Sequence, residues 1–223
     1  VKYMKQLMSV DASDVTVNRD INGNLLSFVI KNDMPLGIKA SGTLDVQAGG
    51  NVSVAGRKDK AGEHSAINVG NIDATKNNKT GNVRLYSDQG IYNDLETEDA
   101  NQTNIIGNNL ILTGGKESIG VSDKPLTVSL TGDLTEARAD KDVFIKNMNN
   151  NDYLRLGAMF AGDAISVESE KGFLMSNANT DIAKSYINAG KTLEFKTNAE
   201  TGIVGEESNP IRILNDRAPV NIT

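Results

Sequence analysis

Cysteine and tryptophan are absent from this 223-residue chain, and all aromatic residues together make up 4% of it. Without cysteine, the chain has no disulfide, no thiol nucleophile and no thiolate metal ligand. It also contains a single histidine, His64, within a charged stretch, so a zinc site built from several histidines of this chain is excluded. We therefore interpret His64 as an exposed loop residue.

The chain also lacks an excess of positive charge, since its formal net charge is -6 at neutral pH. Nucleic-acid partners and anionic membrane surfaces both favour clustered Lys and Arg, so neither is expected as a partner. No run approaches the ~20 apolar residues of a membrane span, and the opening VKYMKQLMSV lacks the regions of a signal peptide. Because the chain opens on Val and stops at VNIT, we expect it to be a fragment of a longer protein.

Helical periodicity is nearly missing, and only the spacing of Val1, Met4, Leu7 and Met8 favours a short helical turn or cap within residues 1–14. From residue 15 onward, short stretches alternate apolar and polar residues, which is typical of strands with one buried face. The alternating pairs include Val15/Val17, Phe28/Ile30, Leu44/Val46, Val52/Val54, Ile67/Val69, Val83/Leu85, Leu110/Leu112, Leu126/Val128, Val143/Ile145, Leu154/Leu156, Ile165/Val167, Leu193/Phe195, Ile211/Ile213 and Val220/Ile222.

Glycine often stands just before these stretches, as in GNVSV at Gly50, GNVRL at Gly81 and GNNLIL at Gly107. Glycine permits a turn with positive φ, and the differing distance to the first apolar residue indicates two turn lengths. Asn-Gly and Asp-Gly turns mark β-hairpins, whereas at these corners Gly precedes Asn. The many Asn residues suit left-handed turn positions and side-chain ladders between stacked strands.

One ten-residue phrase occurs twice, as IGVSDKPLTV from Ile119 to Val128 and as VGEESNPIRI from Val204 to Ile213. A weaker copy of this phrase is MPLGI. The three copies place prolines at 35, 125 and 210, immediately before aliphatic stretches. Proline has no N–H, and the start of a strand is a position where that donor is not needed. Shorter intervals, such as Ile145 to Val167 and Leu193 to Ile213, indicate an underlying cycle of about 20–24 residues.

Together these patterns predict an all-β fold, a right-handed parallel β-helix forming one domain over 1–223, with coils from 15 to 223. About ten coils are expected at the ~4.8 Å spacing of stacked strands. We expect a narrow core of Val, Ile and Leu without aromatic rings.

The segment IGVSDKPLTVSLTGDLTEARADKDVFI and the later NDYLRLGAMFAGDAISVESEKGFLMSN resemble repeats of large secreted filamentous adhesins, most of all the fusobacterial leukotoxin family, which is related to filamentous haemagglutinin. The resemblance is good over about 105–223 and loose over 20–105, and it does not include the family's N-terminal secretion domain. The matching positions are Ile119, Gly120, Pro125, Leu126 and Val128, then Ala137, Ala139, Val143, Ile145, Leu154, Leu156 and Gly157, with a second copy at Val204, Gly205, Pro210, Ile211, Ile213, Ala218, Val220 and Ile222.

Two groups of carboxylates were weighed as sites. Asp94, Glu96, Glu98 and Asp99 fall within 93–104 but match no calcium-binding spacing, so a solvated loop is the favoured reading. A β-helix polysaccharide lyase or hydrolase would need carboxylates on neighbouring coils, at about one-coil spacing. Asp142 and Asp163 are 21 residues apart and Asp133 is 9 before Asp142, which does not exceed chance in a chain with 29 acidic residues. We therefore assign no catalytic, cofactor-binding or metal residue, expect no cofactor, and expect no enzyme activity.

The resemblance implies a rod segment, secreted or on the bacterial cell surface, that presents parts of an adhesin or leukotoxin and contributes to leukocyte adhesion or toxicity. Its expected partners are a host-cell receptor or glycan and, through a part of the parent chain outside this sequence, an outer-membrane transporter. Two alternatives stay open: a carbohydrate-active β-helix enzyme, and a cell-binding module that acts through loops 57–66, 93–104 or 147–152.

Overall fold

The computed structural model describes residues 15–19, 25–30, 36–38, 42–56, 62, 65–76, 80–95, 102–176, 186–214 and 218–223. All elements within these residues are β-strands. The helical turn expected within 1–14 lies outside the described residues, as does His64.

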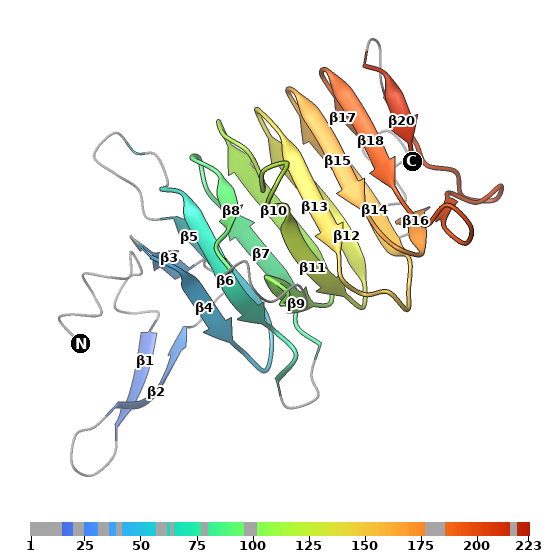
Figure 1. The fold of residues 1–223 in the computed structure, drawn as a ribbon. Coiled ribbons are helices and arrows are strands. Elements are labelled where there is room, and N and C mark those ends of the chain that lie inside the picture. The colour runs from blue at the N-terminus through green and yellow to red at the C-terminus, as the bar shows by residue number, and fades with distance from the viewer. Residues whose placement is uncertain are drawn as a thin grey trace.

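Two large sheets, of nine strands each, contain most of the chain, and most successive strands alternate between them (Figure 1). The first sheet contains, in spatial order, β3 (Leu36–Ile38), β5 (Val52–Gly56), β7 (Val83–Tyr86), β10 (Leu110–Gly115), β12 (Asp133–Ala139), β14 (Leu154–Ala161), β16 (Gly172–Met175) and β19 (Ile203–Val204), with β17 (Ile187–Ala189) beside β14. The second contains β4 (Leu44–Gln47), β6 (Ile67–Asp73), β9 (Ile105–Gly107), β11 (Leu126–Leu130), β13 (Val143–Asn147), β15 (Ala164–Glu168), β18 (Thr192–Lys196) and β20 (Val220–Ile222), with β8 (Ile91–Asn93) beside β6.

Strand pairing within both large sheets is parallel, for example between β5 and β7 and between β13 and β15. The chain is therefore a parallel β-solenoid, and the predicted parallel β-helix is confirmed. The path through each sheet holds eight strands, fewer than the ten or so coils expected. At about 4.8 Å per strand, the stack is about 34 Å long from its first strand to its last.

Aliphatic side chains at equivalent positions stack into continuous columns between the two sheets. In the first sheet one column joins strands β5 to β16, and its members are at most 6% exposed: Val52, Val83, Leu110, Leu134, Leu156 and Met175. In the second sheet a column runs through Ile67, Ile91, Ile119, Val143, Ile165, Leu193 and Val220. The expected pairing of Ile145 with Val167 is confirmed as well. Val220, at the end of its column, is 42% exposed. Burial of the other side chains is the main stabilising contribution, at about 25 cal/mol per Å² of apolar surface.

Aromatic rings also enter the core, contrary to the expectation from the sequence. Phe173 of β16 and Phe195 of β18 are fully buried, and their ring centroids lie 5.2 Å apart at 50°. Since the two strands belong to opposite sheets, the rings fill the space between the sheets in this coil. The interior at this level is therefore wide enough for a tilted ring pair, which is a favourable geometry.

The repeated ten-residue phrase forms the same corner in both places. Gly120 has φ of 67° and Gly205 has φ of 76°, and each N–H donates at 2.8 Å to a carbonyl of the coil before. Directly after each Gly, a tight antiparallel bridge closes the turn, between Val121 and Lys124 in one copy and between Glu206 and Asn209 in the other. The Pro then leads the chain into its next aliphatic stretch.

One buried polar side chain, Asn104, is bonded on every side. Its amide nitrogen donates to the carbonyl of Val69 at 2.7 Å and to that of Gly70 at 3.1 Å. Its carbonyl oxygen accepts the backbone N–H and the hydroxyl of Thr127, both at 2.9 Å. Asn104 therefore links three coils, and neither its side-chain nitrogen nor its side-chain oxygen is left without a hydrogen bond.

Two expectations about strand placement differ from the structure. Strands β1 (Val15–Arg19) and β2 (Leu25–Ile30) do not join the large sheets as coils but pair antiparallel with each other. Asn22 and Gly23 lie between these two strands in the sequence, and an Asn-Gly pair is the usual signal for such a hairpin. The prediction of coils from residue 15 did not take this pair into account. Leu193 pairs with Val220 and not with Ile213, which instead bridges to Ile187, because that coil is longer than 20 residues.

Candidate functional site

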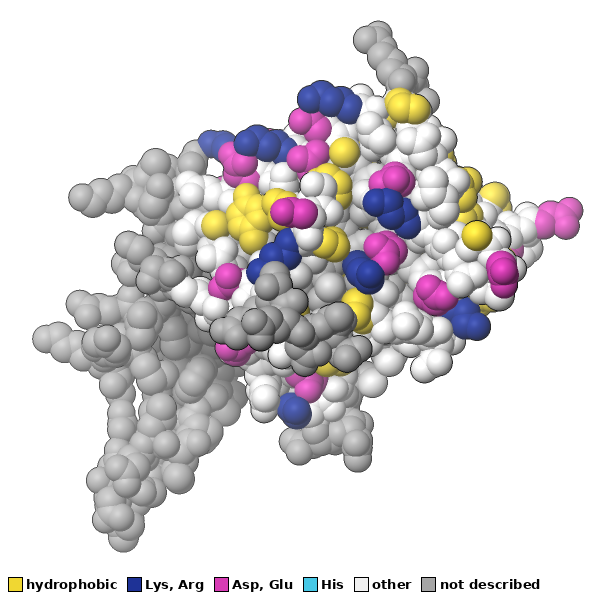
Figure 2. Space-filling view, viewed as in Figure 1, with side chains coloured by type: hydrophobic (Ala, Val, Ile, Leu, Met, Phe, Trp, Pro, Cys, Tyr) yellow, Lys and Arg dark blue, Asp and Glu magenta, His cyan; other side chains and the backbone are white. Residues whose placement is uncertain are grey.

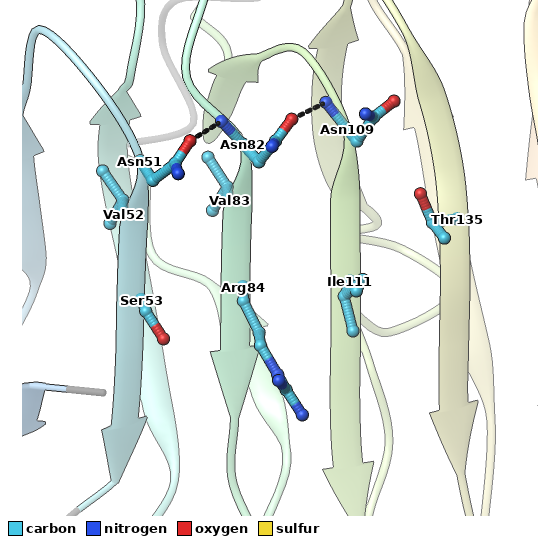
Figure 3. Close-up of a pocket in the computed structure, with 9 residues that line it drawn as sticks. All are labelled: Asn51, Val52, Ser53, Asn82, Val83, Arg84, Asn109, Ile111 and Thr135. Carbon is cyan, nitrogen blue, oxygen red and sulfur yellow. Dashed lines mark hydrogen bonds between the residues drawn. The ribbon is translucent and has the colours of Figure 1, made fainter. Parts of the chain in front are cut away.

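The Gly-Asn corners that precede β5, β7 and β10 stack on one another at the start of the first sheet. Asn51 accepts the backbone N–H of Asn82 on its side-chain oxygen at 2.9 Å, and Asn82 in turn accepts the N–H of Asn109 at 3.1 Å (Figure 3). The Asn109 oxygen then accepts the N–H of Asp133 at 2.9 Å. We call Asn51, Asn82 and Asn109 the Asn ladder; the ladder predicted from the abundance of Asn is present here.

Glycine allows the close backbone stacking that lines up the ladder. A Cβ atom on Gly81 would overlap the carbonyl of Gly50 in the coil before and lie 2.9 Å from the carbonyl oxygen of Ala74. No residue with a side chain fits that space without a shift of the backbone. The Asn after each Gly then supplies an acceptor for an N–H at the next corner, in the manner of a cap.

Beside the Asn ladder, the outer face of the first sheet is hollowed into a groove of about 420 Å³. Its floor is formed by outward-facing residues of four adjacent strands, with Ser53 opposite Arg84 and Arg84 opposite Ile111. Thr135 closes the far side, at a point where the register between β10 and β12 shifts by one residue. Such bulges are over-represented beside binding and active sites. We call this feature the Gly-Asn groove.

Arg84 is the one charged residue that lines the Gly-Asn groove. It is exposed, and within the described part of the chain it forms no ion pair. Elsewhere on the solenoid, cations face carboxylates: Lys146 lies 2.6 Å from Glu168, and Lys191 lies 2.7 Å from Asp163. In Figure 2, Lys and Arg side chains accordingly lie close to Asp and Glu side chains over much of the visible described surface. The groove is therefore a local positive site on an acidic chain.

The three residues of the Asn ladder also line this groove. Each Asn carries two N–H donors on that nitrogen, and no hydrogen bond within the described residues uses the nitrogen of Asn51, Asn82 or Asn109. The three amides and the guanidinium of Arg84 together form a donor-rich surface. Such a surface suits a ligand rich in acceptor oxygens.

The carboxylates weighed in the sequence have local structural partners. Asp142 accepts the N–H of Ala164 at 3.0 Å, and Asp133 accepts the hydroxyl of Ser176. Asp163 is the partner of Lys191, as described above. Among the residues that the structure describes, no group of three or more His, Asp or Glu side chains is arranged to hold a metal ion. The three carboxylates thus do not meet at one place.

Of the three loops considered, only 147–152 is described throughout. There the side-chain oxygen of Asn147 accepts the N–H of Asn149, and that of Asn149 accepts the N–H of Asn151. These successive Asx turns hold the loop close to the coil. Asp94 accepts the hydroxyl of Thr43, while Glu96, Glu98 and Asp99 lie outside the described residues.

Shifted pKa values occur away from the loops and have local causes. The hydroxyl and the N–H of Thr75, both bonded to the carboxylate, hold the pKa of Asp73 below its usual value. The pKa of Tyr86 is raised because its hydroxyl donates to Asp88 at 3.0 Å, and the pKa of Lys141 is raised by Glu117. Each shift reflects a surface partner, which is the usual structural cause.

The fold defines the class of the protein as a parallel β-solenoid, and the outer face of its first sheet carries the polar Gly-Asn groove. No protein-family model matches the chain, and neither a curated protein nor a solved structure does. In the part of the chain that the structure describes, no helix has the length and apolar character of a membrane span.

Ser53, Arg84 and Thr135 were not predicted as groove residues from the sequence. A signal for two of them existed, because aligning GNVSV with GNVRL places Ser53 and Arg84 at the same outward position of consecutive coils. Thr135 gives no such signal in the sequence, because only the register shift between β10 and β12 places it at the edge of the groove.

Proposed function

We propose that this chain is a rod segment of a large exported bacterial adhesin or leukotoxin, located in the secreted or cell-surface part of that protein. In this role it holds binding or toxic elements away from the bacterial surface and contributes to adhesion to host cells such as leukocytes. A transporter in the outer membrane would act on another part of the same polypeptide.

The observation that supports this proposal is the corner formed twice by the repeated phrase, at Gly120 and Gly205. The same phrase is the basis of the resemblance to filamentous adhesins. A corner that recurs with the same backbone geometry allows coils to be added in series, and each coil contacts only its neighbours. The length of the solenoid can therefore be changed by adding or removing coils, as a presenting rod requires.

Replacement of the segment tests the proposal. In the exported parent protein, residues 36–223 would be deleted or exchanged for an unrelated parallel β-solenoid with eight strands in each sheet. The readout is antibody access, on intact bacteria, to an epitope placed on the far side of the segment. A presenting role predicts that deletion reduces access and that the unrelated solenoid restores it; failure of the replacement to restore access would contradict that role.

A further inference from the structure

We propose that the Gly-Asn groove binds an acidic oligosaccharide, with Arg84 on a sugar carboxylate and the Asn ladder donating to hydroxyl and ring oxygens. This inference goes beyond the presenting role and does not depend on it. It assigns a ligand site to a defined place on the outer face of strands β5, β7, β10 and β12.

The first argument is the fixed orientation of the ladder amides. The partner of each side-chain oxygen is a backbone N–H, which can only donate. The amide must therefore present its oxygen to the next corner, which turns its nitrogen to the other side. Asn82 is held most firmly, because its oxygen accepts both the N–H of Asn109 and the side-chain nitrogen of Asn108, at 3.1 and 3.3 Å. These donors are pre-organised, which reduces the entropy lost when a ligand binds.

The second argument is spacing. Corresponding atoms on adjacent parallel strands repeat at about 4.8 Å, so the three amide nitrogens form a row with that period along the solenoid axis. An extended peptide repeats at about 3.3 Å per residue and would fall out of step with this row. A pyranose ring advances a glycan by a distance close to the strand spacing, and its hydroxyl and ring oxygens accept hydrogen bonds. The row therefore favours a glycan over a peptide.

The third argument is charge. Arg84 lies between Ser53 and Ile111 on the groove floor and has no carboxylate partner within the described residues. A guanidinium forms strong charge-assisted hydrogen bonds with a carboxylate. No acidic residue lines the groove, although the chain as a whole has a net charge of -6. The apolar Ile111 gives a surface for the C–H face of a sugar ring. Together these features favour a uronate-containing glycan over a neutral one.

Two groove variants test the site without removing the corner. Asn82→Asp keeps the oxygen that accepts from Asn109 but replaces the amide donors with negative charge; the fold already tolerates an acid at the equivalent place, at Asp133. Arg84→Gln removes the cation from an exposed position. Lys191→Gln is the charge-matched control, since it removes one positive charge from an exposed side chain outside the groove.

The probes are a hyaluronan hexasaccharide, which alternates glucuronate with N-acetylglucosamine, and chitohexaose, which is the neutral polymer of N-acetylglucosamine. The full 223-residue chain is titrated with each sugar, and the side-chain amide signals of the Asn ladder are followed by NMR. Hyaluronan is expected to shift these signals and to bind more tightly than chitohexaose. Each groove variant is expected to weaken hyaluronan binding by about tenfold or more, as for the loss of a charge-assisted hydrogen bond, whereas Lys191→Gln leaves it unchanged.

Three results would overturn the inference. Absence of hyaluronan binding at millimolar concentration would remove the site, and so would binding that persists in both groove variants while their far-ultraviolet circular dichroism matches the wild type. Equal affinity for the two sugars would refute the role of Arg84. None of these results bears on antibody access in the replacement experiment, so the presenting role and the glycan site fail independently.

Discussion

Gly120 is the residue whose substitution most directly tests why the ten-residue phrase recurs. We consider Gly120→Ala. The φ of 67° at this position lies in the left-handed region, where a residue with a side chain is less stable by about 1–2 kcal/mol. The added Cβ would also overlap the carbonyl oxygen of Phe144 and lie 2.8 Å from the backbone nitrogen of Leu126. Relieving such crowding in a packed region costs about 1–3 kcal/mol.

The two contributions together predict a loss of about 3 kcal/mol in the free energy of unfolding. For a domain of this length, each kcal/mol lowers the melting temperature by about 2–4 °C, so Gly120→Ala should melt about 6–12 °C below the wild type. Thermal unfolding followed by circular dichroism measures this difference. Melting within about 2 °C of the wild type would refute the steric reasoning.

Two further glycines serve as matched comparisons. Gly205 occupies the same place in the second copy, with φ of 76°, but its nearest contact is the nitrogen of Ile211 at 2.9 Å and no carbonyl takes the place of that of Phe144. Gly205→Ala should therefore destabilise the protein about half as much. Gly50 has no atom within 4 Å of an added Cβ and no positive φ, so Gly50→Ala should be neutral or stabilising by up to about 1 kcal/mol. A loss in Gly50→Ala as large as that in Gly120→Ala would contradict the assignment.

Three other changes have defined outcomes. Leu112→Ala, which truncates a fully buried side chain, should lower the free energy of unfolding in urea by about 2–5 kcal/mol; a change below 1 kcal/mol would show that the buried core at Leu112 does not support the fold. Asn104→Ala leaves buried backbone groups of neighbouring coils without partners and should cost about 1–3 kcal/mol in the same assay. Thr75→Val should raise the pKa of Asp73 towards its usual value, because the Thr75 hydroxyl is the main cause of its lowering; carboxyl carbon NMR titration measures it. The pKa of Asp73 is lower in the folded than in the unfolded protein. The Asp73 carboxylate therefore stabilises the fold fully above its unfolded pKa, and this stabilisation is lost as the pH falls through its folded pKa. Thr75→Val should make this pH-dependent loss of stability smaller.

Much of the fold could be predicted because strand stacking depends on local patterns. Alternating aliphatic residues after a Gly or Pro corner can bury one face only between two sheets, and Ile145 pairs with Val167 as their interval suggests. The corners at Gly120 and Gly205 follow from one phrase because the backbone geometry there depends on residues close in the sequence.

The number and length of the coils could not be predicted in the same way. Paired strands lie 19 residues apart between Leu126 and Ile145 but 33 apart between Ile72 and Ile105. The number of residues between paired positions differs from coil to coil, and pairing depends on which aliphatic residue enters the column. A period taken from sequence intervals therefore fails where this number is large, as it does between Leu193 and Val220.

Of the candidate site, only the Asn ladder could be predicted from the sequence. The Gly-Asn corners indicate a ladder, because each Asn must accept an N–H of the next corner. Alignment of the Gly-Asn phrases places Ser53 and Arg84 at the same outward position, but the sequence does not indicate that these positions border a groove. The groove requires the register of four strands, and the shift at Thr135 that bounds it is a three-dimensional property.

The same ladder that builds the corner also sets the size of the proposed ligand. Its oxygens hold successive coils together, while its nitrogens stay available, so scaffold and binding depend on different atoms of one side chain. On the next strand, Asp133 donates its backbone N–H to Asn109, but its carboxylate accepts the hydroxyl of Ser176 and has no N–H to donate. The row of donors thus ends where the register shift at Thr135 closes the groove. A glycan gains amide contacts over two strand spacings, about 10 Å, and none beyond them, so the groove is suited to a short stretch of sugar units.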